Sequence, residues 1–108
     1  MELERYLTDE GVDVLQEWLT NLRDKQVRWT ILRRLDRIKG NNLGQVRALR
    51  NGVWELKIDF GPGYRVYYAH AGQTIILLLC GGDKSSQDAD INRAVGYWVN
   101  YQQRVRRL

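Results

Sequence analysis

The stretch VWELKIDFGPGYRVYYAH, residues 53–70, decides the fold of this chain. Over residues 54–60 apolar and charged side chains alternate, which predicts a strand with one apolar and one polar face. Gly61-Pro62-Gly63 indicates a turn, so residues 64–70 are expected to return as an antiparallel neighbour. The stretch therefore predicts a β-hairpin.

The turn length also predicts which residues of the hairpin face each other. A loop restricted to residues 61–63 places Asp59 opposite Arg65, and Lys57 opposite Tyr67. All four side chains then lie on the polar face of the hairpin.

Outside the hairpin, the periodicity of apolar residues predicts the remaining elements. They are a first strand over residues 2–7, a helix after Gly11 reaching Leu22, a helix from a cap at Asp24 to Gly40, a buried strand over residues 74–80, and a last helix from Gln87. Gly81 and Gly82 are expected to form a tight turn, and Ser85 to cap the last helix. We expect an α+β fold, in which a small, mostly antiparallel sheet packs against an N-terminal helical hairpin and a C-terminal helix.

Composition and charge limit the function classes. A chain of 108 residues with 44% hydrophobic content is expected to form one domain, residues 1–108. With a single cysteine it cannot form an internal disulfide, and no signal peptide or membrane-spanning run is evident, so we expect a cytoplasmic protein without a membrane partner. Residues 1–24 carry seven acidic and two basic side chains, whereas residues 25–65 carry three acidic and ten basic ones. This polarity favours nucleic acid as a partner.

Several residues with reactive side chains have a structural explanation instead. His70 shares strand parity with the apolar face, so it is expected to point away from Lys57 and Arg65. Cys80 ends a buried strand and is expected in the core. The same expectation holds for Trp18, Trp29, Trp54 and Trp98, which lie on or beside apolar stripes. An ATP-binding P-loop is excluded, because Leu78 and Asp83 stand where its pattern requires glycine.

Two motifs carry a family resemblance. ELKIDFGPGYRVYY at residues 55–68 and CGGDKSSQ at residues 80–87, together with the two-helix N-terminal half, resemble the RelE/ParE superfamily of toxin–antitoxin toxins, in particular the HigB-like addiction module killer proteins. The resemblance extends over about residues 3–98. It implies a RelE-like fold and the toxin of a type II toxin–antitoxin system, an endoribonuclease (mRNA interferase) that cleaves mRNA at the ribosome and so inhibits translation.

The resemblance also implies partners. They are mRNA and the ribosome, a cognate antitoxin of helix-turn-helix type, and promoter DNA only together with that antitoxin. No metal and no organic cofactor is implied.

Metal-free RNA cleavage uses the substrate's 2′-hydroxyl as nucleophile, so the protein must assist proton transfer and stabilise charge on the pentavalent phosphorus. The family's basic positions match Lys57, Arg65 and Lys84, and the predicted register adds Tyr67 as a fourth catalytic candidate. The expected RNA-binding residues are Arg33, Arg34, Arg37, Ser85 and Ser86. For the two serines and Lys84 the physical reason is an anion site at the start of the last helix.

Two other functions remain open. A ParE-like toxin shares the fold but poisons DNA gyrase without nuclease activity, and a degenerate toxin would only bind its antitoxin and DNA. The nuclease reading requires Lys57, Arg65 and Lys84 to converge on an uncovered part of the polar sheet face, which the gyrase reading does not. The start of the last helix lacks the aromatic or histidine residue of several ribosome-dependent toxins, so the general base and acid stay unassigned.

Overall fold

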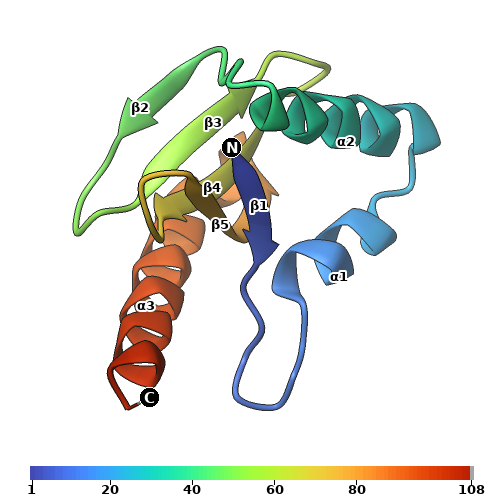
Figure 1. Cartoon of the computed structure of the whole chain (residues 1–108). Coiled ribbons are helices and arrows are strands. Elements are labelled where there is room, and N and C mark those ends of the chain that lie inside the picture. Colours follow the sequence, from blue (N-terminus) through green and yellow to red (C-terminus); the bar gives the residue numbers. More distant parts are fainter. Residues whose placement is uncertain (108) are drawn as a thin grey trace.

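The predicted hairpin lies inside a five-stranded sheet in the computed structural model, which describes residues 1–107 (Figure 1). The elements are β1 (Glu2–Arg5), α1 (Val14–Asn21), α2 (Lys25–Lys39), β2 (Val46–Ala48), β3 (Trp54–Ile58), β4 (Tyr64–His70), β5 (Ile75–Asp83), the 3-10 turn η1 (Lys84–Ser86) and α3 (Gln87–Arg106). The strand order is β1-β5-β4-β3-β2, with β1 parallel to β5 and the other neighbours antiparallel. The predicted α+β fold class is confirmed, and the arrangement is consistent with a RelE-like fold. The separate strand β2 was not predicted.

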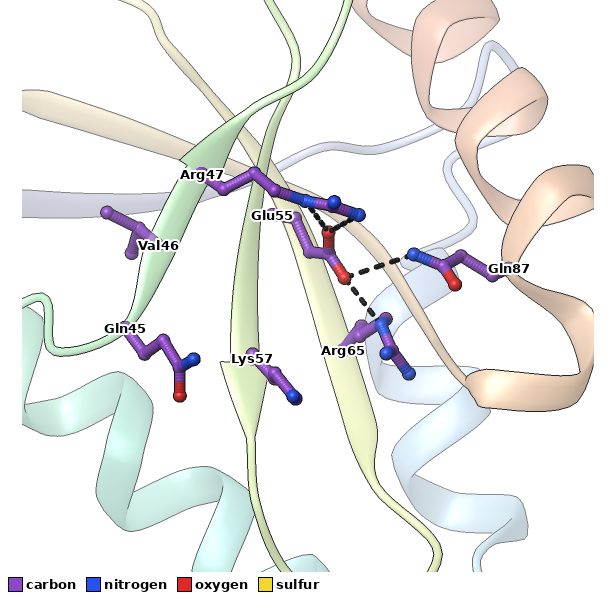
Figure 2. A pocket seen from close by; sticks show the side chains of 7 residues that line it. All are labelled: Gln45, Val46, Arg47, Glu55, Lys57, Arg65 and Gln87. Carbon is purple, nitrogen blue, oxygen red and sulfur yellow. Dashed lines mark hydrogen bonds and ion pairs between the residues drawn. The ribbon is translucent and has the colours of Figure 1, made fainter.

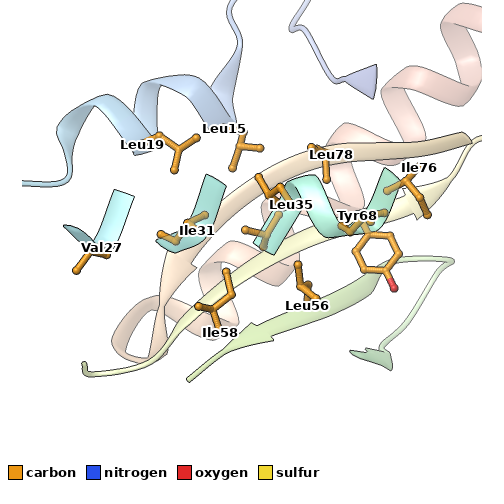
Figure 3. Close-up of a cluster of buried hydrophobic side chains, with 12 residues drawn as sticks. Leu15, Leu19, Val27, Ile31, Leu35, Leu56, Ile58, Tyr68, Ile76 and Leu78 are labelled. Atoms are coloured by element: carbon orange, nitrogen blue, oxygen red, sulfur yellow. The ribbon is translucent and has the colours of Figure 1, made fainter. Parts of the chain in front are cut away.

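Helices α1 and α2 cover one face of the sheet. The α2 residues at helical spacing, Val27, Ile31, Leu35 and Ile38, are buried with Leu15 and Leu19 of α1. They pack on the apolar face of the strands, which includes Leu56, Ile58, Tyr68, Ile76 and Leu78 (Figure 3). Each of these helices begins at an aspartate whose carboxylate accepts a backbone N–H of the first turn: Gln16 N–H donates to Asp13, and Gln26 N–H donates to the predicted cap Asp24.

Helix α3 covers only part of the opposite face of the sheet. Ala94 and its neighbours pack on Tyr67, Ala69, Leu77 and Leu79 in a second buried cluster. Glu55, Lys57 and Arg65 continue the same face beyond α3, because strand side chains alternate. This polar extension is the part of the sheet that remains for a functional site.

The register of the β3–β4 hairpin differs from the prediction by two residues. Lys57 faces Arg65 and Glu55 faces Tyr67, so the expected pairs of Asp59 with Arg65 and of Lys57 with Tyr67 are wrong. The turn is longer because Gly61 and Gly63 adopt positive φ angles of 57° and 89°, which lets the chain turn within residues 59–63. The parity is unchanged, so the predicted faces are correct although the predicted partners are not.

Gly81 and Gly82 do not form the expected tight turn, since they continue β5 to Asp83. A Cβ on Gly81 would overlap the Trp18 ring, and a Cβ on Gly82 would overlap the Asp90 carboxylate. Glycine is required here because α1 and α3 both approach the strand closely.

The start of α3 also differs from the prediction. The Asp83 carboxylate accepts the Ser85 backbone N–H at 2.8 Å and so caps η1. Ser86 occupies the N-cap position of α3 but makes no side-chain cap hydrogen bond. The predicted capping role of Ser85 is therefore wrong, because Ser85 lies inside η1 and the N-cap position of α3 falls on Ser86.

Gly82→Ala is expected to lower the free energy of unfolding by about 1–3 kcal/mol, the usual effect of overpacking a dense site. The added methyl group would displace the Asp90 carboxylate from its partners Ser86 and Arg93. Gly96→Ala is the matched control, since Gly96 is exposed on α3 and a Cβ there meets nothing within 4 Å. It is expected to raise stability by about 0.5–1 kcal/mol. Urea unfolding measures both changes, and a Gly82→Ala protein as stable as wild type would refute the close contact.

Candidate functional site

A cavity of about 370 Å³ opens on the polar face of β3 and β4, next to the start of α3. We call it the Glu55 cavity (Figure 2). It is lined by Gln45, Val46, Arg47, Glu55, Lys57, Arg65 and Gln87. Three strands and one helix start thus contribute to it, and all of these lining residues lie between positions 45 and 87.

Glu55, only 3% exposed as a residue, lies at the centre of the group of side chains that line this cavity. It accepts Arg47 Nε at 2.9 Å, Arg65 Nε at 2.5 Å and Gln87 Nε2 at 3.3 Å. Figure 2 shows these three side chains gathered around it. These three donors fix the position of the carboxylate, and the carboxylate in turn fixes the direction of the Arg65 guanidinium.

Sequence reasoning missed Glu55, Arg47 and Gln87. The signal that could have found Glu55 is its parity, because it shares the strand face with Lys57. Two cations directly opposite each other, Lys57 and Arg65, require a nearby anion, and the diagonal position of Glu55 supplies it.

Lys57 and Arg65 are the two predicted catalytic residues that this cavity brings together. Arg65 is 8% exposed, and its Nη1 atom is buried without a hydrogen-bond partner among residues 1–107. Lys57 has 40% of its side chain exposed and forms an ion pair with Asp59 at 3.6 Å. Arg65 and the accessible ammonium group of Lys57 therefore line the same polar cavity.

Tyr67, the third candidate on this face, lies outside the cavity beneath α3. Its side chain is fully buried, and its hydroxyl has no hydrogen-bond partner within residues 1–107. Burial, with smaller effects of Glu55 and Asp90, raises the pKa of Tyr67 well above its ordinary value. The phenol is thus neutral and enclosed in this structure.

A second depression, which we call the α2 groove, adjoins the Glu55 cavity. Its volume is about 480 Å³, and Gln45 and Lys57 line both. The other lining residues of the groove are Gln26, Trp29, Thr30, Arg33, Arg34, Arg37, Ile58 and Asp59. The three arginines predicted to bind RNA therefore lie along one groove that leads to Lys57.

Arg34 also has a structural role in this groove. Its guanidinium donates to the carbonyl oxygens of Leu43 at 3.4 Å and Lys57 at 3.5 Å. These hydrogen bonds connect α2 to the loop before β2 and to β3. Burial, and secondarily Arg37, lowers the pKa of Arg34. Arg33 and Arg37 are exposed and free to contact a ligand.

Trp29 departs from its prediction, because it is 60% exposed instead of lying in the core. Trp18, Trp54 and Trp98 are partly buried against the two apolar clusters, as expected. On α2 the buried stripe passes through residues 27, 31 and 35, and Trp29 lies on the flank of the helix with Arg33 one turn later.

Lys84, Ser85 and Ser86 lie on the exposed or partly exposed η1 turn and line neither the Glu55 cavity nor the α2 groove. The Ser85 hydroxyl donates to Asp83 at 2.5 Å, and the Ser86 hydroxyl donates to Asp90 at 2.6 Å. The expectation of two free hydroxyl donors at this helix start is therefore wrong, because the chain's own carboxylates accept them. The Glu55 cavity therefore brings together two of the three cations that the nuclease interpretation requires, Lys57 and Arg65, without Lys84.

Two other residues assigned to structure, His70 and Cys80, behave as expected. His70 packs edge-on against Trp54 and Tyr68, on the face opposite Lys57 and Arg65. Cys80 is fully buried, and burial raises the pKa of its thiol to about 12. Within residues 1–107, no cluster of His, Cys, Asp and Glu side chains could hold a metal ion, and no helix is long and apolar enough to cross a membrane.

Comparison with known proteins places these residues in a family context. The model of a family described as phage-derived protein Gp49-like matches residues 17–94, which include every residue lining the Glu55 cavity. A protein of Haemophilus influenzae, described only as an uncharacterized protein, is 42% identical over 77 residues, which is 71% of this chain and 78% of the relative.

Proposed function

The chain belongs to the Gp49-like family of phage-derived proteins, and from this membership and the geometry of the Glu55 cavity we propose that it is the toxin of a type II toxin–antitoxin system. Its proposed activity is metal-free cleavage of mRNA at the ribosome, which stops translation. The proposed site of action is the cytoplasm.

One observation carries the proposal: Arg65, whose Nη1 has no hydrogen-bond partner within residues 1–107, and the accessible ammonium of Lys57 line one cavity. A buried donor without a partner is uncommon in proteins and is costly to maintain. A phosphodiester oxygen in the cavity would give this N–H an acceptor and would add a charge-assisted hydrogen bond. The Glu55 carboxylate accepts Nε of this guanidinium at 2.5 Å and leaves Nη1 without a partner in the described part of the chain.

The proposed reaction is attack of a ribose 2′-oxygen on the adjacent phosphorus. The P–O2′ bond forms as the 2′-proton passes to solvent water, and the bond from phosphorus to the 5′-oxygen breaks as that oxygen takes a proton from the Lys57 ammonium. The products are a 2′,3′-cyclic phosphate and a 5′-hydroxyl end. Arg65 stabilises the pentavalent phosphorus through Nη1, and Lys57 is positioned to protonate the leaving oxygen. Glu55 acts as a positioning residue because its oxygens already accept Arg47, Arg65 and Gln87.

The flanking nucleotides would follow the basic surface on both sides of the cavity. Arg33, Arg34 and Arg37 in the α2 groove are proposed to attract RNA phosphates through sequence-independent electrostatics. Lys84, exposed on η1, is proposed to contact the RNA backbone beyond Gln87. The proposed protein partner is a helix-turn-helix antitoxin that neutralises the toxin and binds promoter DNA with it.

Expression of the chain in a bacterial cell, followed by primer extension on abundant messages, tests this function. The expected result is new 5′ ends within open reading frames together with a rapid loss of protein synthesis, and both effects should disappear when the antitoxin is coexpressed. Purified protein added to mRNA with and without programmed ribosomes then measures ribosome dependence.

Intact messages with DNA damage and filamentous growth would instead support the gyrase-poisoning alternative. Intact messages with normal growth and normal protein synthesis would indicate a degenerate toxin. Either outcome refutes the nuclease proposal.

A further inference from the structure

Trp29 is the most exposed large apolar side chain of the described residues, and its surroundings distinguish it from an isolated surface residue. It lies on α2 one turn before Arg33, whose guanidinium stacks over the indole ring at 4.8 Å from the ring centroid. Trp29 remains 60% exposed even with this cation over it. A single exposed tryptophan alone would need no explanation.

Trp29 is not such an isolated residue, because it lines the α2 groove. Trp29 lines it together with Arg33, Arg34, Arg37 and Lys57, and Asp59 is the only acidic lining residue. A groove of about 480 Å³ has the volume of an ordinary small-ligand site. Cations beside an exposed aromatic ring are the combination with which proteins hold single-stranded nucleic acid, since the cations contact phosphates and the ring stacks on a base.

The groove is also continuous with the proposed reaction site. Gln45 and Lys57 line both the α2 groove and the Glu55 cavity, so an RNA strand with a phosphate at Arg65 passes Lys57 before it reaches Trp29. The spacing along α2 supports one path, because Gln26, Trp29, Arg33 and Arg37 recur at intervals of three and four residues and therefore share one helix face.

We infer that Trp29 is a stacking platform for one base of single-stranded RNA, next to the nucleotides whose linkage is cut. This inference deepens the proposed function and depends on it for the identity of the RNA. Every base has an apolar face, so the platform adds affinity and positions the strand without strict sequence preference. Arg33 has two functions here: it supports the indole ring from one side and contacts phosphate.

Binding of a short, fluorescein-labelled 2′-O-methyl RNA tests the platform, because this RNA lacks the nucleophilic hydroxyl and is not cut. Trp29→Ala is expected to bind about 5- to 150-fold more weakly than wild type at low salt, the range for loss of one aromatic stacking partner. Trp29→Phe retains an aromatic face and is expected to bind much closer to wild type. Leu32→Ala is the matched control, since Leu32 is exposed on α2 but lies outside the groove.

A series of oligonucleotides with one abasic position separates stacking from a structural effect. At the stacked position, removal of the base is expected to abolish the difference between wild type and Trp29→Ala, whereas a folding defect would weaken all oligonucleotides equally. An equal loss along the whole series, or no loss for Trp29→Ala, overturns the inference.

The two proposals fail in different ways. Cleavage of mRNA by wild type combined with unchanged RNA binding by Trp29→Ala overturns the platform alone. Trp29-dependent binding without any cleavage supports the platform and refutes the nuclease. Unchanged RNA binding with lost neutralisation by the antitoxin assigns Trp29 to a protein contact and overturns the inference.

Discussion

Arg65→Ala is expected to reduce the rate of mRNA cleavage by about 100- to 1,000-fold, the usual effect of removing one donor that stabilises transition-state charge. The variant is expected to remain folded, because Glu55 keeps Arg47 at 2.8 Å and Gln87 at 3.3 Å as partners. Single-turnover cleavage on programmed ribosomes measures the rate, and circular dichroism with thermal unfolding checks the fold. Arg106→Ala, at the exposed end of α3, is the control and should cleave at the wild-type rate.

Arg65→Lys separates charge from geometry. An ammonium is a point charge without the planar fork of a guanidinium, so it is not expected to serve Glu55 and a phosphate together. Most of the activity should therefore be lost in Arg65→Lys as well. Wild-type cleavage by Arg65→Ala in a folded protein would place the reaction elsewhere, and a loss in Lys84→Ala as large as in Arg65→Ala would indicate a site that includes η1.

Strand parity explains why the sequence predicts part of this site and not the rest. Alternation along a strand assigns each side chain to a face regardless of turn length, so Lys57 and Arg65 were correctly placed together. The partner across the hairpin depends on the turn, and the positive φ angles of Gly61 and Gly63 were not evident from the sequence. The incorrect register made Asp59 the expected partner of Arg65 in place of Glu55, so the buried anion was missed.

Features that arise where segments distant in the sequence pack against each other could not be predicted from the sequence either. Gly81 and Gly82 resemble a turn signal, but they lie in a strand. Trp18 and Asp90 pack so closely on this strand that a larger side chain would not fit at either position. Trp29 lies near an apolar stripe, and its exposure follows from where α2 meets the sheet. Lys84 matches a family motif, yet its position outside the Glu55 cavity depends on η1, which no pattern in the sequence indicates.

Glu55→Leu is expected to lower the free energy of unfolding by about 3–5 kcal/mol, a large part of the stability of a domain of this size. Leucine has a volume similar to that of glutamate, so the loss reflects an unpaired charge more than a cavity. Arg65 would keep its buried position, with 9% of its side chain exposed, but would lose its carboxylate. Urea unfolding at neutral pH measures the change. Asp59→Asn is the matched control, because the Asp59–Lys57 ion pair is exposed and should contribute less than about 1 kcal/mol.

The double variant Glu55→Leu/Arg65→Met distinguishes an unpaired charge from a general packing defect. Removal of both charges leaves no buried cation to desolvate, so the double variant is expected to be more stable than Glu55→Leu alone. Arg47 tolerates the loss of Glu55 in either protein, because 63% of its side chain is exposed to water. The stability losses of Glu55→Leu and Arg65→Met, each measured alone, are compared with the loss in the double variant. If the two losses simply add, Glu55 and Arg65 are not coupled. The argument that the carboxylate holds the guanidinium for phosphate then fails.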